Sequence, residues 1–178
     1  HNAAGGFLVE IYDELRAKPA LVKRIAQSIV QEHFTESIQD DLLCAVGLDV
    51  STETVTRRKR DPRFRAEVIR AYEHRCAICG FSLKLSNADL GLEAAHIKWH
   101  QAGGPDSVTN GLALCVLHHK LFDRGAFTIL PDYRIVVSEH VYGPSGLNSW
   151  LTCFHEYEIQ YPQSSRYYPD EQFLNWHK

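Results

Sequence analysis

The chain lacks several features that would place it quickly in a class of proteins. Its 178 residues contain no run of about 18 apolar residues and no charged and then apolar leader, so neither membrane insertion nor export is indicated. No internal repeat or low-complexity tract is visible. With 44% hydrophobic and 23% charged residues, the sequence predicts a soluble globular protein, for which a cytoplasmic setting is the default expectation.

The cysteines do not form an even disulfide framework. There are five of them, which fits a reducing compartment in which some thiols hold metal and the others are buried. We expect Cys76, Cys79 and Cys115 to be metal ligands, and Cys44 and Cys153 to be buried free thiols.

The chain also lacks an excess of positive charge. Its net charge is −3, which argues against a polyanionic partner, but the distribution of charge matters more than the sum. Six of the nine residues from 57 to 65 are basic. This stretch is either a solvated linker or an arm that contacts nucleic-acid phosphates. Its basic residues are Arg57, Arg58, Lys59, Arg60, Arg63 and Arg65.

The first part of the chain has helical periodicity. Apolar residues recur at spacings of three and four between residues 7 and 48, and a third short helix is expected between Thr35, as N-cap, and Gly47. Three short helices cannot easily close a core alone, so this segment is expected to dock on the rest or to be the tail of a larger unit. Residues 49–61 have the composition of a linker, and Pro62 is well placed to begin the next helix.

The later elements predict an α+β fold. A strand at residues 90–97, a polar, turn-rich loop and an extended segment lead into a helix at 115–124, which gives the order β-β-α. A polar loop is expected around residues 86–89, a hairpin from 127–130 and 135–137, and helices near 147–154 and 171–177. The predicted organisation is a helical segment at 1–50, a basic linker at 51–61 and a third region at 62–178.

Four residues have the spacing of a structural zinc site. Cys76 and Cys79 form one Cys-x-x-Cys pair, and Cys115 and His118 form a matching Cys-x-x-His pair. A two-residue gap lets a tight turn direct both side chains at one tetrahedral centre. Such a site would stabilise the fold and do no chemistry, because four protein ligands leave no open position.

A second set of residues is interleaved with the first, namely His96, Asn110 and His119. Because His118 and His119 are adjacent at a predicted helix start, their side chains must point in different directions. One therefore faces the zinc clip and the other a separate site.

The sequence around these residues resembles the HNH endonuclease family whose members carry a zinc clip. The resemblance covers roughly residues 61–130 and rests on the segments 76–80, 93–97, 110–115 and 118–123, where residue types, order and spacing agree together. Residues 95–105 and 173–177 are similar to the nuclease half of type IV restriction enzymes that carry a sulfur-binding domain for phosphorothioated DNA. The helical segment is similar to the last part of that domain.

The resemblance implies a role for each residue of the second set. His96 would be the general base, although a lone strand histidine is more often structural. Asn110 would brace the two arms of the motif or fix His96, where ordinary turn chemistry is the alternative. His119 would bind a catalytic divalent cation, with Asp123 one helical turn later touching the cation or orienting the imidazole. The alternative for His119 is a histidine that is merely packed beside the zinc clip.

One departure from the family pattern concerns the residue before the base. Many members have an aspartate or histidine there as a second metal ligand, whereas this chain has Ala95. Glu93 and His100 are candidate substitutes, and both are equally well explained as surface groups.

The expected activity is hydrolysis of double-stranded DNA, with phosphorothioated DNA as the candidate target. The cofactors would be a structural Zn²⁺ and a catalytic Mg²⁺, Mn²⁺, Co²⁺ or Ni²⁺. Lys98, Lys120 and Arg124 would neutralise flanking phosphates. A homodimer is expected if two single-metal centres cut the two strands. The rival is a zinc-stabilised nucleic-acid-binding module without catalysis, which Ala95 favours, and RNA is the alternative substrate.

Overall fold

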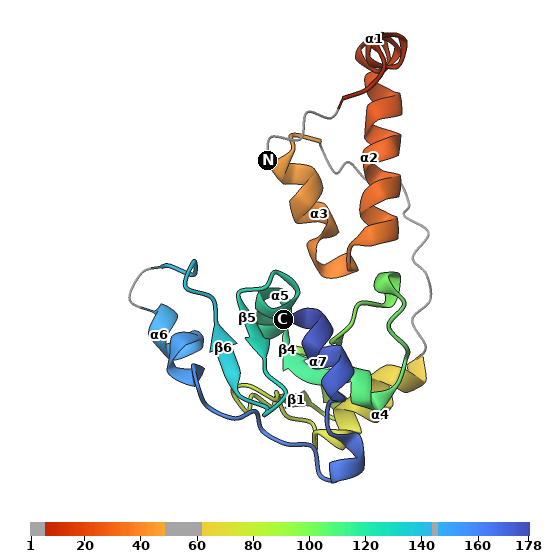
Figure 1. Ribbon diagram of the computed structural model, residues 1–178. Helices are drawn as coiled ribbons and strands as arrows, with labels where there is room; N and C mark the ends of the chain where they lie inside the picture. The colour runs from red at the N-terminus through yellow and green to blue at the C-terminus, as the bar shows by residue number, and fades with distance from the viewer. Residues whose placement is uncertain (1–5, 49–61, 144–145) are drawn as a thin grey trace. The chain divides into compact units, whose positions relative to one another are not determined.

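The computed structural model describes residues 6–48, 62–143 and 146–178 (Figure 1). The chain divides into two compact units, His1–Glu53 and Thr54–Lys178. The predicted boundaries at 50 and 61 stay a prediction, and Arg57, Arg58, Lys59 and Arg60 lie outside the described residues. Within the described residues, no helix is both long enough and apolar enough to span a membrane.

The first unit contains the three predicted helices, α1 Val9–Ala17, α2 Pro19–His33 and α3 Glu36–Ala45. Pro19 occupies the first turn of α2, where its missing N–H costs nothing. Thr35 precedes α3 as predicted, although its side chain makes no capping hydrogen bond. Among the described residues of this unit, the buried hydrophobic ones are Val30, Ile38 and Leu43, and α1 contributes none. This small number of buried hydrophobic residues agrees with the prediction that three short helices cannot easily close a core alone.

The second unit contains the predicted β-β-α element. Strand β3, Leu92–His96, pairs antiparallel with β4, Gly111–Cys115, and α5, Val116–Asp123, follows directly. The register runs from Leu92 opposite Cys115 to His96 opposite Gly111. The predicted strand at 90–97 is therefore confirmed in slightly shorter form.

Helices cover both faces of this two-stranded sheet. On one face, α4, Pro62–Ala71, comes so close that a Cβ added to Gly111 would lie 2.4 Å from Val68 Cγ2. The ring of Phe64 in α4 stacks on the His96 ring on this face. Since side chains alternate along a strand, Glu93 lies on the opposite face, where it contacts α5.

Shorter elements complete the second unit. The ribbon of β1, Lys84–Leu85, and β2, Ala88–Asp89, occupies the segment predicted as a polar loop. The predicted hairpin is present as β5, Phe127–Ile129, and β6, Ile135–Val137. Besides a 3₁₀ turn at Thr152–Phe154, 3₁₀ turns lie at His100–Ala102, Val108–Asn110 and Ser165–Tyr167.

The C-terminal helices match the predictions in part. The helix expected at 147–154 is divided into α6, Leu147–Trp150, and a 3₁₀ turn, Thr152–Phe154, because the buried Leu151 has non-helical dihedrals. Helix α7, Glu171–His177, is present, and the predicted cap Asp170 accepts a hydrogen bond from the Gln172 N–H. In Figure 1, α7 (dark blue) ends beside α5.

The prediction for the two remaining cysteines was wrong for Cys44, which is exposed, and Cys153 is half-buried. Cys44 falls on the outward side of α3, where the first unit has little interior to offer it.

Candidate metal centres and active site

The zinc clip is built from a tight turn and a strand-to-helix junction. The turn at Cys76 closes with a hydrogen bond from the Gly80 N–H to the Cys76 carbonyl (2.9 Å), and Gly80 has a φ of +70°, which a glycine adopts without strain. Cys115 ends β4 and His118 lies in the first turn of α5. One ligand atom from each of Cys76, Cys79, Cys115 and His118 lies within 4.8 Å of the other three.

The spacing of these atoms fits a tetrahedral zinc. Zinc to sulfur and nitrogen distances of about 2.3 and 2.05 Å place neighbouring S and N ligands about 3.6 Å apart. The His118 Nδ1 lies 3.2 Å from Cys115 Sγ and 3.7 Å from Cys76 Sγ, which brackets that value. The four residues therefore fit the ion that their spacing predicted.

The electrostatics of the cluster also favour a cation. Hydrogen bonds from Cys76 and Cys79 lower the pKa of the Cys115 thiol, while the hydrogen bond with Cys115 raises the pKa of Cys76. Burial alone would lower the pKa of His118, but contacts with Cys115 and Cys79 raise it to about 9. Negative charge thus accumulates at a buried point, where a metal would neutralise it.

The orientation of His118 is set from a distant part of the chain. Its Nε2 lies 2.9 Å from the backbone carbonyl of Trp150 in α6. Because a carbonyl only accepts, Nε2 carries a proton, and Nδ1 is the nitrogen that would bind the ion of the clip. No local pattern in the sequence around Trp150 signals this contact.

Asn110 is buried and braces the loop that follows β3. Its Oδ1 accepts from the Lys98 N–H at 2.9 Å, while its Nδ2 donates to the carbonyls of Lys98 (3.0 Å) and Pro105 (2.9 Å). Gly104 lies under this brace, and a Cβ there would be 1.9 Å from the Lys98 carbonyl oxygen. These hydrogen bonds tie Asn110, just before β4, to the loop that follows β3, and the role of Asn110 in catalysis stays a prediction.

His96 ends β3 with its ring held on two sides. Phe64 stacks on it with centroids 4.1 Å apart, and its Nε2 lies 2.7 Å from Asp106 Oδ1. The side chain of His96 is 9% exposed and that of Asp106 is 28% exposed. Asp106 was not among the predicted site residues. One signal could have found it: the loop from 97 to 110 must return to the end of β3, because His96 pairs with Gly111.

His119 lies between two carboxylates. Its Nδ1 is 2.6 Å from Glu93 Oε2, and its Nε2 is 3.2 Å from Asp123 Oδ2. Burial by itself would lower the pKa of His119, but hydrogen bonds with Asp123 and Glu93 raise it to about 9. The structure thus brings together three residues that the sequence marked for a catalytic cation, on the α5 face of β3.

The donor set of this cluster suits a hard divalent cation. Carboxylate oxygens and one imidazole are ligands that Mg²⁺, Mn²⁺ and related ions accept. Ala95 is buried on the same face of β3 as Glu93 and offers no ligand, so Glu93 is the carboxylate that the strand supplies. His100 instead lies by His96, with ring centroids 5.9 Å apart.

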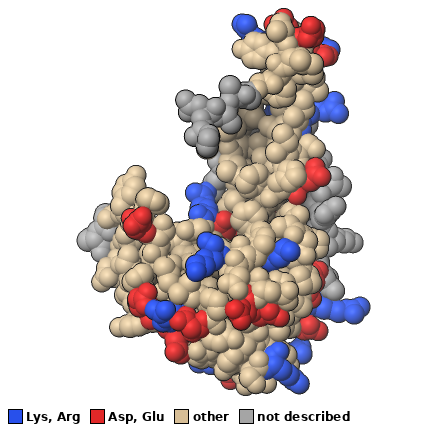
Figure 2. All heavy atoms as spheres, in the orientation of Figure 1, with Lys and Arg blue, Asp and Glu red and all other residues tan. Residues whose placement is uncertain are grey.

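The candidate phosphate contacts are Lys98, Lys120 and Arg124. Lys120 and Arg124 are exposed at the end of α5, and Lys98 is half-buried after β3. On the face shown in Figure 2, basic and acidic side chains are interspersed in the lower part of the view. Trp99 is half-buried and packs edge to face against Trp176.

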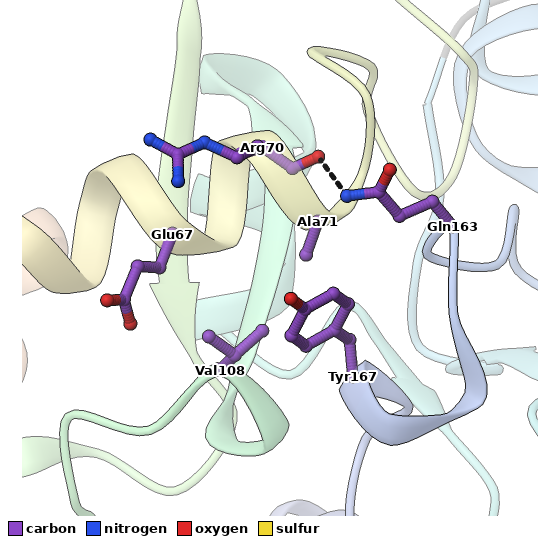
Figure 3. A pocket seen from close by; sticks show the side chains of 6 residues that line it. All are labelled: Glu67, Arg70, Ala71, Val108, Gln163 and Tyr167. Carbon is purple, nitrogen blue, oxygen red and sulfur yellow. Dashed lines mark hydrogen bonds between the residues drawn. The ribbon is translucent and has the colours of Figure 1, made fainter.

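A shallow cleft lies elsewhere, beside α4 (Figure 3). It contains none of the candidate site residues, and a hydrogen bond from Gln163 Nε2 to the Arg70 carbonyl closes one end. Its lining residues are Glu67, Arg70, Ala71, Val108, Gln163 and Tyr167.

Comparisons with known proteins found two family matches and a similar solved structure. Residues 76–130 match the family model of the HNH endonuclease domain, and residues 1–51 match that of the ScoMcrA-like DNA sulfur-binding domain. Among solved structures, a chain described as a modification-dependent TagI restriction endonuclease is 26% identical with a TM-score of 0.48. The match covers 70% of this chain and 39% of that one. The search of curated proteins found no match.

The first family match contains the zinc clip and every residue of the set His96, Asn110 and His119. The second covers the helical unit described above. The chain therefore carries an HNH endonuclease domain, preceded by a segment of the ScoMcrA-like DNA sulfur-binding family.

Proposed function

We propose that the protein hydrolyses phosphodiester bonds of double-stranded DNA with a divalent cation, as the cleavage part of a phosphorothioate-dependent restriction enzyme. The observation that carries this proposal is the Glu93, His119 and Asp123 cluster on the β-β-α element of an HNH domain. Cytosolic Mg²⁺ or Mn²⁺ would suit these donors, as would Co²⁺ or Ni²⁺ in the assay.

Hydrolysis needs a base for the attacking water and positive charge for the leaving oxygen. His96 takes the proton from the water, and the adjacent Asp106 carboxylate stabilises the imidazolium that forms. His119, with the carboxylates of Glu93 and Asp123 beside it, forms the site at which the cation would bind. The bound cation would supply charge stabilisation at the leaving oxygen. Asn110 keeps the loop after β3 in place, so that Lys98 and Asp106 remain next to the base.

The exposed basic groups would contact the DNA backbone. Lys120 and Arg124 follow His119 on α5, so they can neutralise phosphates on either side of the scissile one. Arg57, Arg58, Lys59 and Arg60 would add phosphate contacts of the same kind.

Dependence on backbone sulfur is the finer part of the proposal. It is supported by the family match over residues 1–51, which precedes the nuclease domain in the chain. A homodimer would place one single-metal centre on each strand.

The test is nicking of a supercoiled plasmid by zinc-loaded protein, with and without added Mn²⁺. Wild type should cut only with Mn²⁺, and His96→Ala and His119→Ala should abolish cutting while the zinc content stays unchanged. His140→Ala is the matched control, because His140 is 89% exposed and outside the site. Cutting by His96→Ala at the wild-type rate would remove the proposed base.

Matched DNA duplexes with and without one phosphorothioate test the substrate. Faster cleavage of the modified duplex is expected, and equal rates for the two would contradict the sulfur dependence without touching the nuclease proposal.

The second candidate is a nucleic-acid-binding module that has lost catalysis. It is favoured by Ala95, which is fully buried and leaves the strand without the usual ligand. Binding of DNA with no cutting under any of the four cations would establish it. An RNA duplex run in parallel decides between the two nucleic acids.

A further inference from the structure

The two carboxylates on His119 cannot have the same function. A neutral imidazole has one lone pair, so only one of its nitrogens binds a cation while the other keeps its proton. Glu93 lies on the Nδ1 side and Asp123 on the Nε2 side. The carboxylate on the metal side can share the cation, and the other accepts the remaining N–H.

Distance alone does not assign the two roles. Ligands at adjacent corners of an octahedron with bonds of about 2.1 Å lie about 3 Å apart. The separations of 2.6 Å to Glu93 and 3.2 Å to Asp123 are both within half an ångström of that value.

Solvent exposure does separate them. The Glu93 side chain is 46% exposed, whereas that of Asp123 is 1% exposed and His119 is 4% exposed. A cation that acts on DNA must also contact a phosphate oxygen and water, so it has to lie on the open side of the imidazole.

Helix α7 packs against the end of α5 that carries Asp123. The ring of His177 stacks on Phe122, the residue before Asp123, with centroids 3.7 Å apart and planes at 3°. Its Nε2 donates to the Phe122 carbonyl at 3.1 Å, and its Nδ1 lies 3.0 Å from the Thr128 hydroxyl, which donates to it. His177 thus ties the end of α5 that carries Asp123 to α7 and to β5.

We propose that Glu93 and His119 Nδ1 are the cation's protein ligands, and that Asp123 is a positioning residue that holds the proton on His119 Nε2. This assignment rests on the proposed function and specifies its metal site. In this assignment Glu93 supplies the ligand that Ala95 cannot supply. Glu93 lies two residues before Ala95 and on the same face of β3. Asp123 and the α7 contact then keep the imidazole in one tautomer.

The test compares Glu93→Gln with Asp123→Asn in zinc-loaded protein by Mn²⁺ titration. Glu93→Gln removes an anionic ligand and should raise the Kd for Mn²⁺ about 100-fold or more. Asp123→Asn keeps an oxygen that accepts the Nε2 proton, so its effect should be about 10-fold, as for outer groups of metal sites. Glu67→Gln on α4 is the matched control and should bind Mn²⁺ like the wild type.

A second measurement needs no variant. In the Mg²⁺-bound wild type, ¹⁵N-detected NMR of the histidine rings should show the His119 proton on Nε2. A proton on Nδ1, or a larger loss of Mn²⁺ affinity in Asp123→Asn than in Glu93→Gln, would overturn the assignment. If His119→Ala binds Mn²⁺ as the wild type does, the proposed cation site itself is wrong.

Discussion

Binding of the catalytic cation should compete with a proton at His119. Without the cation, the imidazole donates to two carboxylates, and these contacts outweigh burial and raise its pKa to about 9. A cation can bind only after that proton leaves, since a ligating nitrogen needs its lone pair. Raising the pH is therefore the perturbation, and the apparent affinity for Mn²⁺ is the quantity that changes.

The magnitude follows from the pKa. Well below pH 9 the protonated fraction is close to one, so each pH unit should change the apparent Kd about tenfold, or about 1.4 kcal/mol. From pH 6 to 8, Mn²⁺ should thus bind about 100-fold more tightly. Two carboxylates without this proton linkage would show almost no change, because they are ionised throughout this range.

Calorimetric titration of zinc-loaded protein in buffers of different ionisation enthalpy measures both quantities. We expect the release of close to one proton per Mn²⁺ at pH 7, and a slope of about one when log Kd is plotted against pH. His119→Gln should lose both the slope and most of the affinity. A flat profile in the wild type, or the same slope in His119→Gln, would refute the linkage.

In the cation-free protein, raising the pH should lower the stability of the fold, whereas it raises the affinity for the cation. The folded-state pKa of His119 is raised above its ordinary value of 6.5, so its stabilising contribution is fully present below pH 6.5 and is lost as the pH rises towards 9. The amount is roughly 3 kcal/mol in the free energy of unfolding. Urea unfolding at several pH values, with His119→Gln as the reference, separates this contribution from those of other groups.

Four further outcomes are expected. Removal of zinc by a strong chelator should abolish the far-UV signal and protease resistance of residues 75–120, because such a site contributes on the order of 10 kcal/mol; an unchanged digest would contradict this. Gly103→Ala carries only the penalty of alanine at a φ of +79°, because a Cβ there meets nothing within 4 Å, so Gly104→Ala should destabilise the protein by about 1–3 kcal/mol more; equal melting temperatures would be inconsistent with the clash. Asn110→Ala should cost about 3 kcal/mol for three hydrogen bonds, and Asn110→Asp more, because a carboxylate would face two carbonyls; denaturant midpoints decide. Asp106→Asn should lower the cleavage rate about tenfold with unchanged Mn²⁺ affinity, and an unaffected rate would leave Asp106 without a role.

Local patterns in the sequence predicted the zinc clip and the elements around it. The Cys-x-x-Cys and Cys-x-x-His spacings work because each pair is closed by a single turn, so the geometry is contained in four residues. The β-β-α order and the cap at Asp170 were readable for the same reason. Such signals require no knowledge of what the segment packs against.

The parts of the site that the sequence did not reveal depend on contacts between distant segments. The Trp150 carbonyl meets His118 from 32 residues away, and His177 meets Phe122 from 55 residues away. Any residue type can supply a backbone carbonyl such as that of Trp150, so its sequence gives no signal. His177 is not part of a pair or cluster with a recognisable spacing, so its contact with Phe122 could not be predicted. Asp106 was missed for another reason. It lies in a run of turn-forming residues, where an aspartate is expected without any role in a site.

The hydrogen bond between His118 and Trp150 determines how far the HNH domain can be shortened without loss of stability. A fragment that ends at residue 130, where the family match ends, would retain all four zinc-binding side chains. It would lack the Trp150 carbonyl and so leave the buried Nε2–H of His118 without its hydrogen-bond acceptor. Loss of this hydrogen bond should lower the free energy of unfolding by about 1–3 kcal/mol. It would also let the His118 imidazole rotate, which should lower the affinity for zinc. A shortened HNH domain that keeps this hydrogen bond therefore has to extend beyond the matched residues and at least through α6.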